Sequence, residues 1–403
     1  NAKFEELNVN SKIEDLFAGK NVNYTEDQAA WHPQYRANTP NWPSKDLSVI
    51  LNKGVLDGVL NIVVLGIGGS FEGPKLLIES LIGPNTHLNH LFITGSDPIE
   101  FIEKTSNLKK NETLFIISSK SFTTDETLET LNDAIKWSGD MNKFIAITAN
   151  ESEASKYNIK HIIKFDKEIG GRYSIWSDIA VPAFLDATFE PDNFLKGGNQ
   201  ADLDLQNNKK YLEFVKTLSY SDIWLNNSEN KTSRAVLSYS WKLRSFADYV
   251  QQLEMESLGK QPHENSVFKK TGQIIFGGYG PTAQHSYFQL LHQGTSSFCA
   301  DIICVDTDKK ENELLFAQSQ AQAGLLAFGA DENLQDHEKV NGQSPVNLIS
   351  LKELNPFNLG YLIASWEHRV FLTSRMLQIN PFDQYGVSAG KIFARKYLDS
   401  NGG

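Results

Sequence analysis

Short apolar runs alternate with segments of helical spacing from about residue 59 to residue 150. In each run the apolar residues follow one another directly, without the polar positions that a strand with one solvated face would show. Strands of this kind, separated by helices, predict a parallel sheet buried on both faces and therefore a doubly wound α/β domain. The predicted strands are Asn61–Gly66, His90–Thr94, Thr113–Ile117 and Lys143–Thr148.

The second half of the chain begins with a helical pattern and then returns to strands. Apolar residues recur at helical spacing in Tyr211–Trp224 and again in Ala235–Met255, so we expect helices there. Strand-like runs follow at Gln273–Phe276, Ala300–Val305 and Val346–Ser350. The predicted fold class is therefore α/β, with two tandem doubly wound parallel-sheet domains and helical flanks, and a ligand is expected at the carboxyl ends of the strands. The predicted parts are an N-terminal flank (1–44), a first domain (45–195), a second domain (196–380) and a C-terminal helix (381–403).

Composition and charge exclude several classes of protein. With 40% hydrophobic and 22% charged residues, the chain is typical of a globular protein and not of a disordered one. Its 38 lysines and arginines against 49 aspartates and glutamates give a net charge of −11 without a basic patch, so neither nucleic acid nor an anionic membrane is an expected partner. The sequence has no apolar stretch of about 18 residues and no basic start followed by an apolar stretch, so we expect neither a membrane span nor secretion.

The two cysteines indicate the redox environment of the protein. Cys299 and Cys304 lie five residues apart in one strand-like run. In a strand they would point to opposite faces and could not form a disulfide with each other. We therefore expect a reducing, cytoplasmic setting.

A glycine-rich turn, Gly66–Gly73, joins the first predicted strand to a helix, where backbone N–H groups and the helix dipole can hold an anion. It is not a dinucleotide-binding turn, because Phe71 stands where a glycine is needed, and it is not a P-loop, because Pro74 stands where lysine is needed. Two interpretations stay open. Either the amides of the turn and the hydroxyl group of Ser70 contact a small polar ligand, or the glycines only let the helix and strand pack closely.

Hydroxyl groups are dense where the third predicted strand ends, in Ser118–Thr127. Thr123 and Glu126 have the spacing of a capping box and predict a helix start there. Capping uses fewer donors than the segment offers, whereas a phosphate group can use them all together with Lys120. We therefore favour a phosphate site over a simple helix cap.

One carboxylate is set apart in the predicted helix that ends at Gln251–Lys260. Gln252 and Glu256 are four residues apart and share a face, whereas Glu254 points about 200° away from Glu256. The competing interpretation is a surface ion pair between Glu256 and Lys260. Such pairs are common and contribute only about 0.3 to 0.5 kcal/mol, and periodicity alone favours this interpretation.

Three further segments carry candidate polar groups. Arg172 follows two glycines and precedes an aromatic helix start, where it could bind an oxyanion or pair with a structural carboxylate. The glycine-rich run Gly277–His285 ends on a histidine, a residue that is more often structural than catalytic when it stands alone, and the nine histidines lack the spacing of a metal site. Near the C-terminus, Asp383 is expected to cap a helix that carries Gln384 and Lys391 on one face.

Taken together, these segments resemble the phosphoglucose isomerase family. They occur in the order of the family and extend nearly from one end of the chain to the other. A weaker match near the N-terminus comprises Asn23–Glu26 with His32 and Arg36. The matching segments are Gly66–Gly73, Ser119–Thr124, Gly170–Ser177, Gln252–Lys260, Gln284–Thr295 and Phe382–Lys391.

The resemblance implies two sugar isomerase (SIS) domains in tandem and the interconversion of glucose 6-phosphate and fructose 6-phosphate through a cis-enediolate, with no metal or redox cofactor. In this family Glu256 would be the base that moves a proton between C1 and C2, and Arg172 would stabilise the enediolate. His285 and Lys391 would assist opening of the sugar ring. The implied substrate contacts are Ser119, Lys120, Ser121 and Thr124 to the phosphate group, Gly69 and Ser70 to the sugar, and Gln252 and Gln384 to its hydroxyl groups.

The same resemblance implies a phosphorylated hexose as substrate and an obligate homodimer in which His285 completes the partner's site. Some positions depart from the family pattern. The loop Gly277–Ala283 differs from the usual sequence before the histidine. Ser388 and Leu258 replace a usual glutamate and asparagine, and Asp178 and Ala180 also depart after the arginine motif. The alternatives are a phosphosugar-binding regulatory protein without catalysis, and an isomerase with another or broader substrate such as mannose 6-phosphate.

Overall fold

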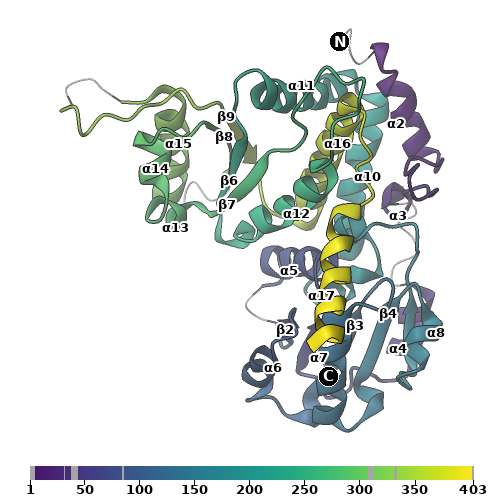
Figure 1. Ribbon diagram of the computed structural model, residues 1–403. Helices are drawn as coiled ribbons and strands as arrows, with labels where there is room; N and C mark the ends of the chain where they lie inside the picture. Colours follow the sequence, from purple (N-terminus) through teal and green to yellow (C-terminus); the bar gives the residue numbers. More distant parts are fainter. Residues whose placement is uncertain are drawn as a thin grey trace.

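Two parallel sheets form separate layers of the molecule (Figure 1). The computed structural model describes residues 5–30, 32–37, 44–83, 86–306, 313–330 and 334–401. The first sheet has the strand order β2-β1-β3-β4-β5 and the second has the order β7-β6-β8-β9, and every neighbouring pair is parallel. The predicted α/β class with two tandem doubly wound sheets is confirmed.

Helices cover both faces of the first sheet. In β1 and β3, even-numbered residues such as Ile62 and Ile116 pack on one helical layer, and odd-numbered ones such as Val63 and Phe115 pack on the other. This explains why the strands are apolar without alternation. The four predicted strands are confirmed, and the half-exposed edge strand β5 was not predicted. The strands are β1 (Asn61–Leu65), β2 (Asn89–Ile93), β3 (Thr113–Ser118), β4 (Phe144–Thr148) and β5 (His161–Lys164). The helices on one face are α4 (Lys45–Leu51) and α9 (Val181–Phe184). The helices on the other face are α6 (Pro98–Thr105), α7 (Asp125–Ser138) and α8 (Glu151–Ser155).

The second sheet contains a central strand that the sequence pattern misplaced. β6 (Ser233–Tyr239) lies between β7 (Ile274–Tyr279) and β8 (Phe298–Val305), and β9 (Val346–Leu351) forms the far edge. The prediction of a helix from residue 235 was therefore wrong as far as residue 245. Residues 234 to 239 are all buried, and a short buried apolar run has no periodicity that separates a strand from a helix. The helix starts only at α12 (Phe246–Leu258).

Two groups of helices enclose the second sheet. The long helices α10 and α16 cross with their backbones in contact: a Cβ atom on Gly197 would lie 1.9 Å from the carbonyl oxygen of Phe357. The predicted boundary between residues 195 and 196 falls inside α10. The helices on the α12 side are α10 (Pro191–Asn207), α11 (Lys209–Asn227) and α16 (Pro356–Leu377), and those on the other side are α13 (Gly280–Gln284), α14 (Phe288–Gln293) and α15 (Glu313–Phe328).

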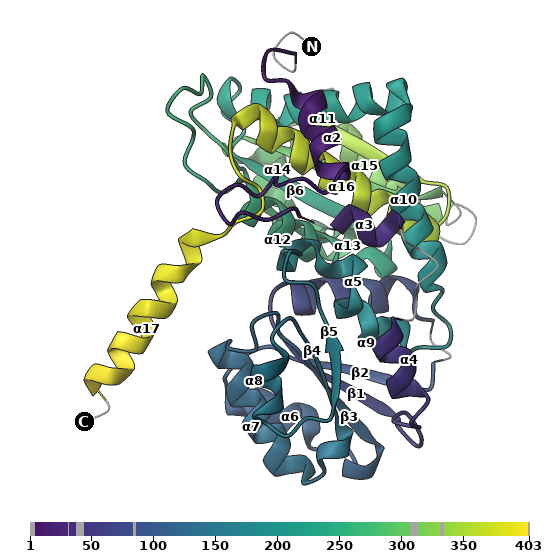
Figure 2. The same ribbon diagram turned by 90° about the vertical axis from the view of Figure 1, so that its right-hand side faces the viewer.

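The flanks differ from the predicted ends of the chain. α2 (Val9–Phe17) and α3 (His32–Ala37) pack on the second domain, where Arg36 forms buried ion pairs with Asp202 and Glu367. At the other end, α17 (Ser388–Asn401) projects away from the body of the molecule (Figure 2). In the described part of the chain, no helix has the length and apolar character that crossing a membrane requires.

The C-terminal helix starts later than predicted. It begins at Ser388 after a short 3-10 turn, η8 (Tyr385–Val387), so Asp383 does not cap it and Gln384 does not share a helical face with Lys391. Asp383 instead accepts a hydrogen bond from Thr25 Oγ1 (2.6 Å) and lies 3.3 Å from Lys260 Nζ. The segment is fixed by these distant partners, which local spacing cannot reveal.

Candidate active site

The glycine-rich turn lies at the carboxyl end of β1 and starts α5 (Gly69–Leu81). Gly68 caps the helix with φ 61°, a conformation that favours glycine. A Cβ atom on Gly69 would lie 1.9 Å from the carbonyl oxygen of Gly171. The turn therefore packs directly against η4 (Gly171–Trp176), the 3-10 segment that carries Arg172. Close packing and ligand contact, the two interpretations left open by the sequence, are compatible at this turn.

The side chains of Glu256 and Arg172 lie close together beside this turn. The carboxylate oxygen Glu256 Oε2 lies 3.3 Å from Arg172 Nε, and the Glu256 side chain is 30% exposed while that of Arg172 is 2% exposed. Gln252 Nε2 donates to Glu256 Oε1 (3.2 Å), which confirms that the two side chains share a face of α12. Glu254 is buried on the opposite side of this helix and pairs with Arg234.

Arg172 forms hydrogen bonds through one nitrogen, while its Nε faces the carboxylate of Glu256. Its Nη2 donates to the carbonyl oxygens of Phe382 (3.1 Å) and Asp383 (2.9 Å). Among the described residues, Nε and Nη1 have no hydrogen-bond partner although both are buried. Buried guanidinium donors of this kind need an acceptor, so they favour an anionic ligand or intermediate at this point.

Lys260 does not form the predicted surface pair with the Glu256 carboxylate. Its Nζ donates to the main-chain oxygens of Glu256 (2.6 Å) and Asp383 (2.7 Å). Burial, followed by the nearby charge of Arg172, lowers the pKa of Lys260. The carboxylate of Glu256 thus remains directed toward Arg172 and the solvent-accessible cavity.

Residues near the N-terminus brace the same region. Asn380 Nδ2 donates to Asn23 Oδ1 (2.8 Å) and Thr25 Oγ1 (2.6 Å), and Thr25 Oγ1 donates in turn to Asp383. His32 stacks on Tyr173, the neighbour of Arg172, with ring centroids 4.6 Å apart. The segment Asn23–Glu26, given no role from its sequence, therefore fixes the loop that holds Arg172.

A cavity of about 610 Å³ opens in front of Glu256. It is formed by the start of α5, one face of α12 and the segment before α17, so both domains contribute to it. Predicted site residues Gln252, Glu256 and Gln384 line it together. Its lining also includes a carboxyl group that the sequence did not single out, that of Glu72.

The hydroxyl-rich segment follows β3, at the same edge of the first sheet as the glycine-rich turn. A Cβ atom on Gly66 would lie 3.0 Å from the carbonyl oxygen of Ser118, so the two turns touch. The predicted capping box is wrong: α7 starts at Asp125, and its N-cap Thr124 makes no side-chain capping bond. The hydroxyl group of Thr123 bonds Ser121 Oγ instead (2.8 Å).

The remaining groups of this segment converge around its turn. Ser119 is buried, and its Oγ accepts the N–H of Phe122 (3.1 Å) and lies 3.4 Å from Thr124 Oγ1. Burial lowers the pKa of Lys120, against the opposing effect of Glu26 and acidic neighbours. Because a desolvated ammonium gains from an anion beside it, this arrangement suits a phosphate group.

Two predicted catalytic residues lie away from the cavity of their own chain. His285 is exposed at the end of α13, on the face of the second sheet opposite α12. Lys391 is exposed on α17, the helix that projects from the body of the molecule (Figure 2). Arg395 of the same helix pairs with Asp125 at the start of α7 (3.0 Å). The chain alone does not bring these two side chains to Glu256.

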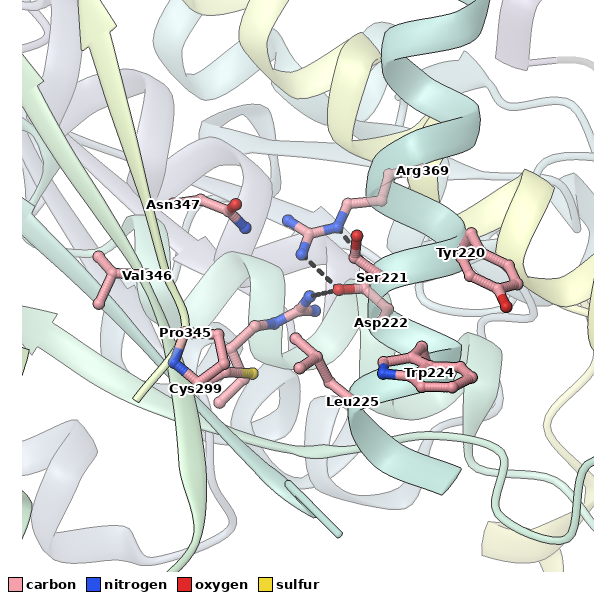
Figure 3. Close-up of a pocket in the computed structure, with 11 residues that line it drawn as sticks. Tyr220, Ser221, Asp222, Trp224, Leu225, Cys299, Pro345, Val346, Asn347 and Arg369 are labelled. Atoms are coloured by element: carbon pink, nitrogen blue, oxygen red, sulfur yellow. Dashed lines mark hydrogen bonds and ion pairs between the residues drawn. The ribbon is translucent and has the colours of Figure 1, made fainter. Parts of the chain in front are cut away.

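A second cavity, of about 390 Å³, lies at the amino ends of β6, β8 and β9 (Figure 3). Asp222 lies between two buried guanidinium groups there, accepting from Arg234 Nη1 and Arg369 Nη2 at 2.6 Å each. Asp301 binds Arg369 as well (2.9 Å). These arginines are neutralised by their partners, and burial raises the pKa of Cys299 to about 11, so the cavity offers neither an anion site nor a thiolate.

Metal ligands do not gather in the described residues, where no group of three or more histidine, cysteine, aspartate or glutamate side chains is placed to hold an ion. The fold and the site define a class: a two-domain SIS-type protein with a glycine-rich turn and a hydroxyl-rich turn beside a carboxylate and an arginine. Its fold is similar to that of tagatose-6-phosphate ketose/aldose isomerase from Escherichia coli, with a TM-score of 0.54, 12% identity, and coverage of 87% of this chain and 93% of that one.

The comparisons identify the family within that class. The phosphoglucose isomerase model matches residues 52–402. A glucose-6-phosphate isomerase from Wigglesworthia glossinidia brevipalpis is 33% identical over 97% of this chain and 81% of its own length. The crystal structure of a glucose-6-phosphate isomerase from Chlamydia trachomatis is similar with a TM-score of 0.86 and 26% identity, over 99% of this chain and 84% of that one. The chain belongs to the phosphoglucose isomerase family.

Proposed function

We propose that the chain interconverts glucose 6-phosphate and fructose 6-phosphate. The observation that carries this is the Glu256 carboxylate, 3.3 Å from the Nε of a buried arginine whose Nη1 has no hydrogen-bond partner in the described structure, in a cavity that the glycine-rich turn helps to form. A proton next to a carbonyl group leaves slowly unless a positioned base and a fixed cation act together. This site supplies both.

Glu256 is the base in this proposal. It takes the proton from C2 of the open-chain aldose, the electron pair of that bond forms the C1–C2 double bond, and the negative charge moves to O1. Arg172 Nε and Nη1 stabilise the resulting cis-enediolate. Glu256 then returns its proton to C1, and a proton passes from O2 to O1, which gives the ketose.

The phosphate group binds at the turn after β3 in this proposal. The side chains of Ser119, Ser121 and Thr124 contact its oxygens, and the ammonium group of Lys120 balances its charge. Gly69 and Ser70, on the adjoining turn, contact the sugar. Gln252 and Gln384, which line the cavity with Glu256, orient its hydroxyl groups.

Ring opening needs a donor that protonates the ring oxygen and an acceptor for the proton of the hydroxyl group on C1, and His285 and Lys391 take these roles. His285 is exposed on the far side of its own second domain, so we propose that a second copy of the chain supplies it and that the enzyme is a homodimer.

The two buried cysteines, Cys299 and Cys304, are in line with a reducing, cytoplasmic compartment.

Exchange of the C2 proton of glucose 6-phosphate with solvent tests the base directly. We expect the wild-type protein to catalyse exchange and isomerisation, and Glu256→Gln to lose both by about 10³-fold or more, because the amide cannot accept the proton. Glu264→Gln, an exposed glutamate beyond the end of α12, is the matched control and should stay within about 2-fold. Phosphosugar binding without exchange in the wild type would instead support a regulatory binding protein.

A further inference from the structure

Glu72 is a second carboxyl group in the wall of the cavity. It lies in the first turns of α5, where its N–H donates to the carbonyl oxygen of Gly68 (2.8 Å), and it lines the same cavity as Gln252 and Glu256. Its Oε2 is buried and has no hydrogen-bond partner among the described residues. A buried carboxyl oxygen without a partner is costly, so a ligand or ordered water is needed to satisfy it.

The charged groups around Glu72 are already committed to other partners. Lys75 on the same helix pairs with Asp248 of α12 (3.0 Å), and Glu79 pairs with Arg244 (3.2 Å). Burial raises the pKa of Glu72 to about 7; the charge of Lys75 opposes this change, and the charges of Asp248 and Glu79 add to it. Near neutral pH a substantial fraction of Glu72 is therefore protonated and can donate a hydrogen bond. The other charged groups that line the cavity are Asp248, Glu256 and Lys260.

Gly68 separates Glu72 from the predicted sugar-binding amide. Gly68 has φ 61°, which favours glycine, and a Cβ atom there would lie 3.0 Å from Gln252 Nε2. Glu72, one helical turn after Gly68, and Gln252 line the same cavity, so one sugar bound there can contact both side chains.

We propose that Glu72 is a further substrate-binding residue, whose carboxyl group hydrogen-bonds a hydroxyl of the sugar beside Gln252. This inference rests on the proposed function. The protonated form donates to the sugar oxygen and adds no charge. The ionised form cannot donate and faces a phosphorylated, negatively charged substrate.

Steady-state kinetics of Glu72→Met test the contact itself. The methionine side chain is about as long as that of glutamate but cannot donate a hydrogen bond. The KM for fructose 6-phosphate should therefore rise about 10-fold, while kcat stays within about 3-fold of the wild-type value. The inhibition constant of inorganic phosphate, which probes only the turn after β3, should stay within about 2-fold.

Glu72→Gln tests the protonation state and is close to isosteric, which protects the fold. Its amide donates at every pH, so the ratio of the wild-type KM to the variant KM should be near 1 at pH 6 and rise about 3-fold to 10-fold by pH 8. Titration of the substrate phosphate cancels in this ratio, because both proteins bind the same substrate.

Glu79→Gln is the matched control for both variants. Glu79 lies two turns further along α5 and also has a buried oxygen without a hydrogen-bond partner in the described structure, but it does not line the cavity. Its KM ratio should stay near 1 from pH 6 to pH 8. Thermal unfolding of all three variants checks that each is folded.

The outcomes separate this inference from the proposed function. A wild-type protein without isomerase activity would contradict the proposed function. An active wild type whose KM is unchanged, within 2-fold, by Glu72→Met would contradict only the role of Glu72. An equal effect of Glu79→Gln on KM would overturn that role as well, because it would show a general response of α5.

Discussion

At the scale of single residues, burial decides the chemistry of carboxyl groups in this protein. Asp178, at the start of a 3-10 turn behind the first sheet, is buried, and its Oδ1 has no hydrogen-bond partner in the described structure. Burial raises its pKa to about 6, with a smaller contribution from Asp46. Asp186 shows the opposite behaviour: it accepts bonds from Thr188 and Thr86, which lower its pKa despite burial.

The pH dependence of the protein's stability should follow from the directions of these two pKa shifts. Because Asp178 binds its proton more tightly in the folded state, its favourable contribution is complete below about pH 4 and is lost as pH rises through 6. Asp178→Asn removes this loss. We expect the stability of the variant relative to wild type to improve by up to about 2 kcal/mol between pH 4.5 and pH 7.5.

Unfolding temperatures measured across this pH range check the prediction. Asp186→Asn is the control with the opposite sign, since a lowered pKa contributes stability that is present at neutral pH and lost in acid. Its destabilisation should be largest near pH 7 and shrink at lower pH. Parallel behaviour of the two variants would contradict the assignment for Asp178.

Sequence patterns predicted the polar residues of the site only where their partners are local. Gln252 and Glu256 share a helical face, which a period of 3.6 residues reveals. The partners of Arg172 lie more than 200 residues away, at Phe382 and Asp383, and no local spacing indicates them. Glu72 went unnoticed because its raised pKa comes from packing between α5 and α12, which only the fold creates.

At the scale of elements, strands between helices were predicted well, and the strand β6 was not. Its buried run, residues 234 to 240, is separated from α12 only by a short 3-10 turn. The first sheet was predicted more completely because glycine and polar turns mark the end of each strand. The start of α7 shows the converse: a capping-box spacing was present, but its hydroxyl groups bond each other.

The contact between α10 and α16 depends on glycine. A Cβ atom on Gly197 would lie 1.9 Å from the main-chain oxygen of Phe357, and backbone cannot move aside as a flexible side chain can. We expect Gly197→Ala to destabilise the protein by about 2 to 3 kcal/mol, the range of overpacked cores. Gly324→Ala, inside α15 with no atom within 4 Å, should be neutral or up to about 1 kcal/mol stabilising.

Denaturant unfolding of both glycine variants measures these differences. Both substitutions add the same methyl group to a helix interior, so helix propensity cancels between them and the remaining difference reports the crossing of α10 and α16. Equal stability of the two variants would show that these helices can separate without cost.

At the scale of the whole molecule, the site depends on both domains. α5 belongs to the first domain and α12 to the second, and the ion pairs Lys75–Asp248 and Arg244–Glu79 join them beside the cavity. The net charge of −11 opposes the approach of a phosphorylated sugar, so the proposed binding mode requires local positive groups, for which Lys120 and Arg172 are the candidates. Two predicted groups, His285 and Lys391, lie outside this shared region.

Mixing two inactive variants tests whether a second copy completes the site. In a dimer of Glu256→Gln and His285→Ala, one site would combine an intact Glu256 with the histidine of the other copy, and the second site would lack both groups. With equal amounts and random exchange, half of the dimers are mixed, so about a quarter of wild-type activity should return. The subunits are exchanged by unfolding and refolding the mixture. Each variant treated in the same way on its own is the control. If the histidine acted within its own chain, every site in the mixture would lack one group, and no activity would return beyond that of the separate variants.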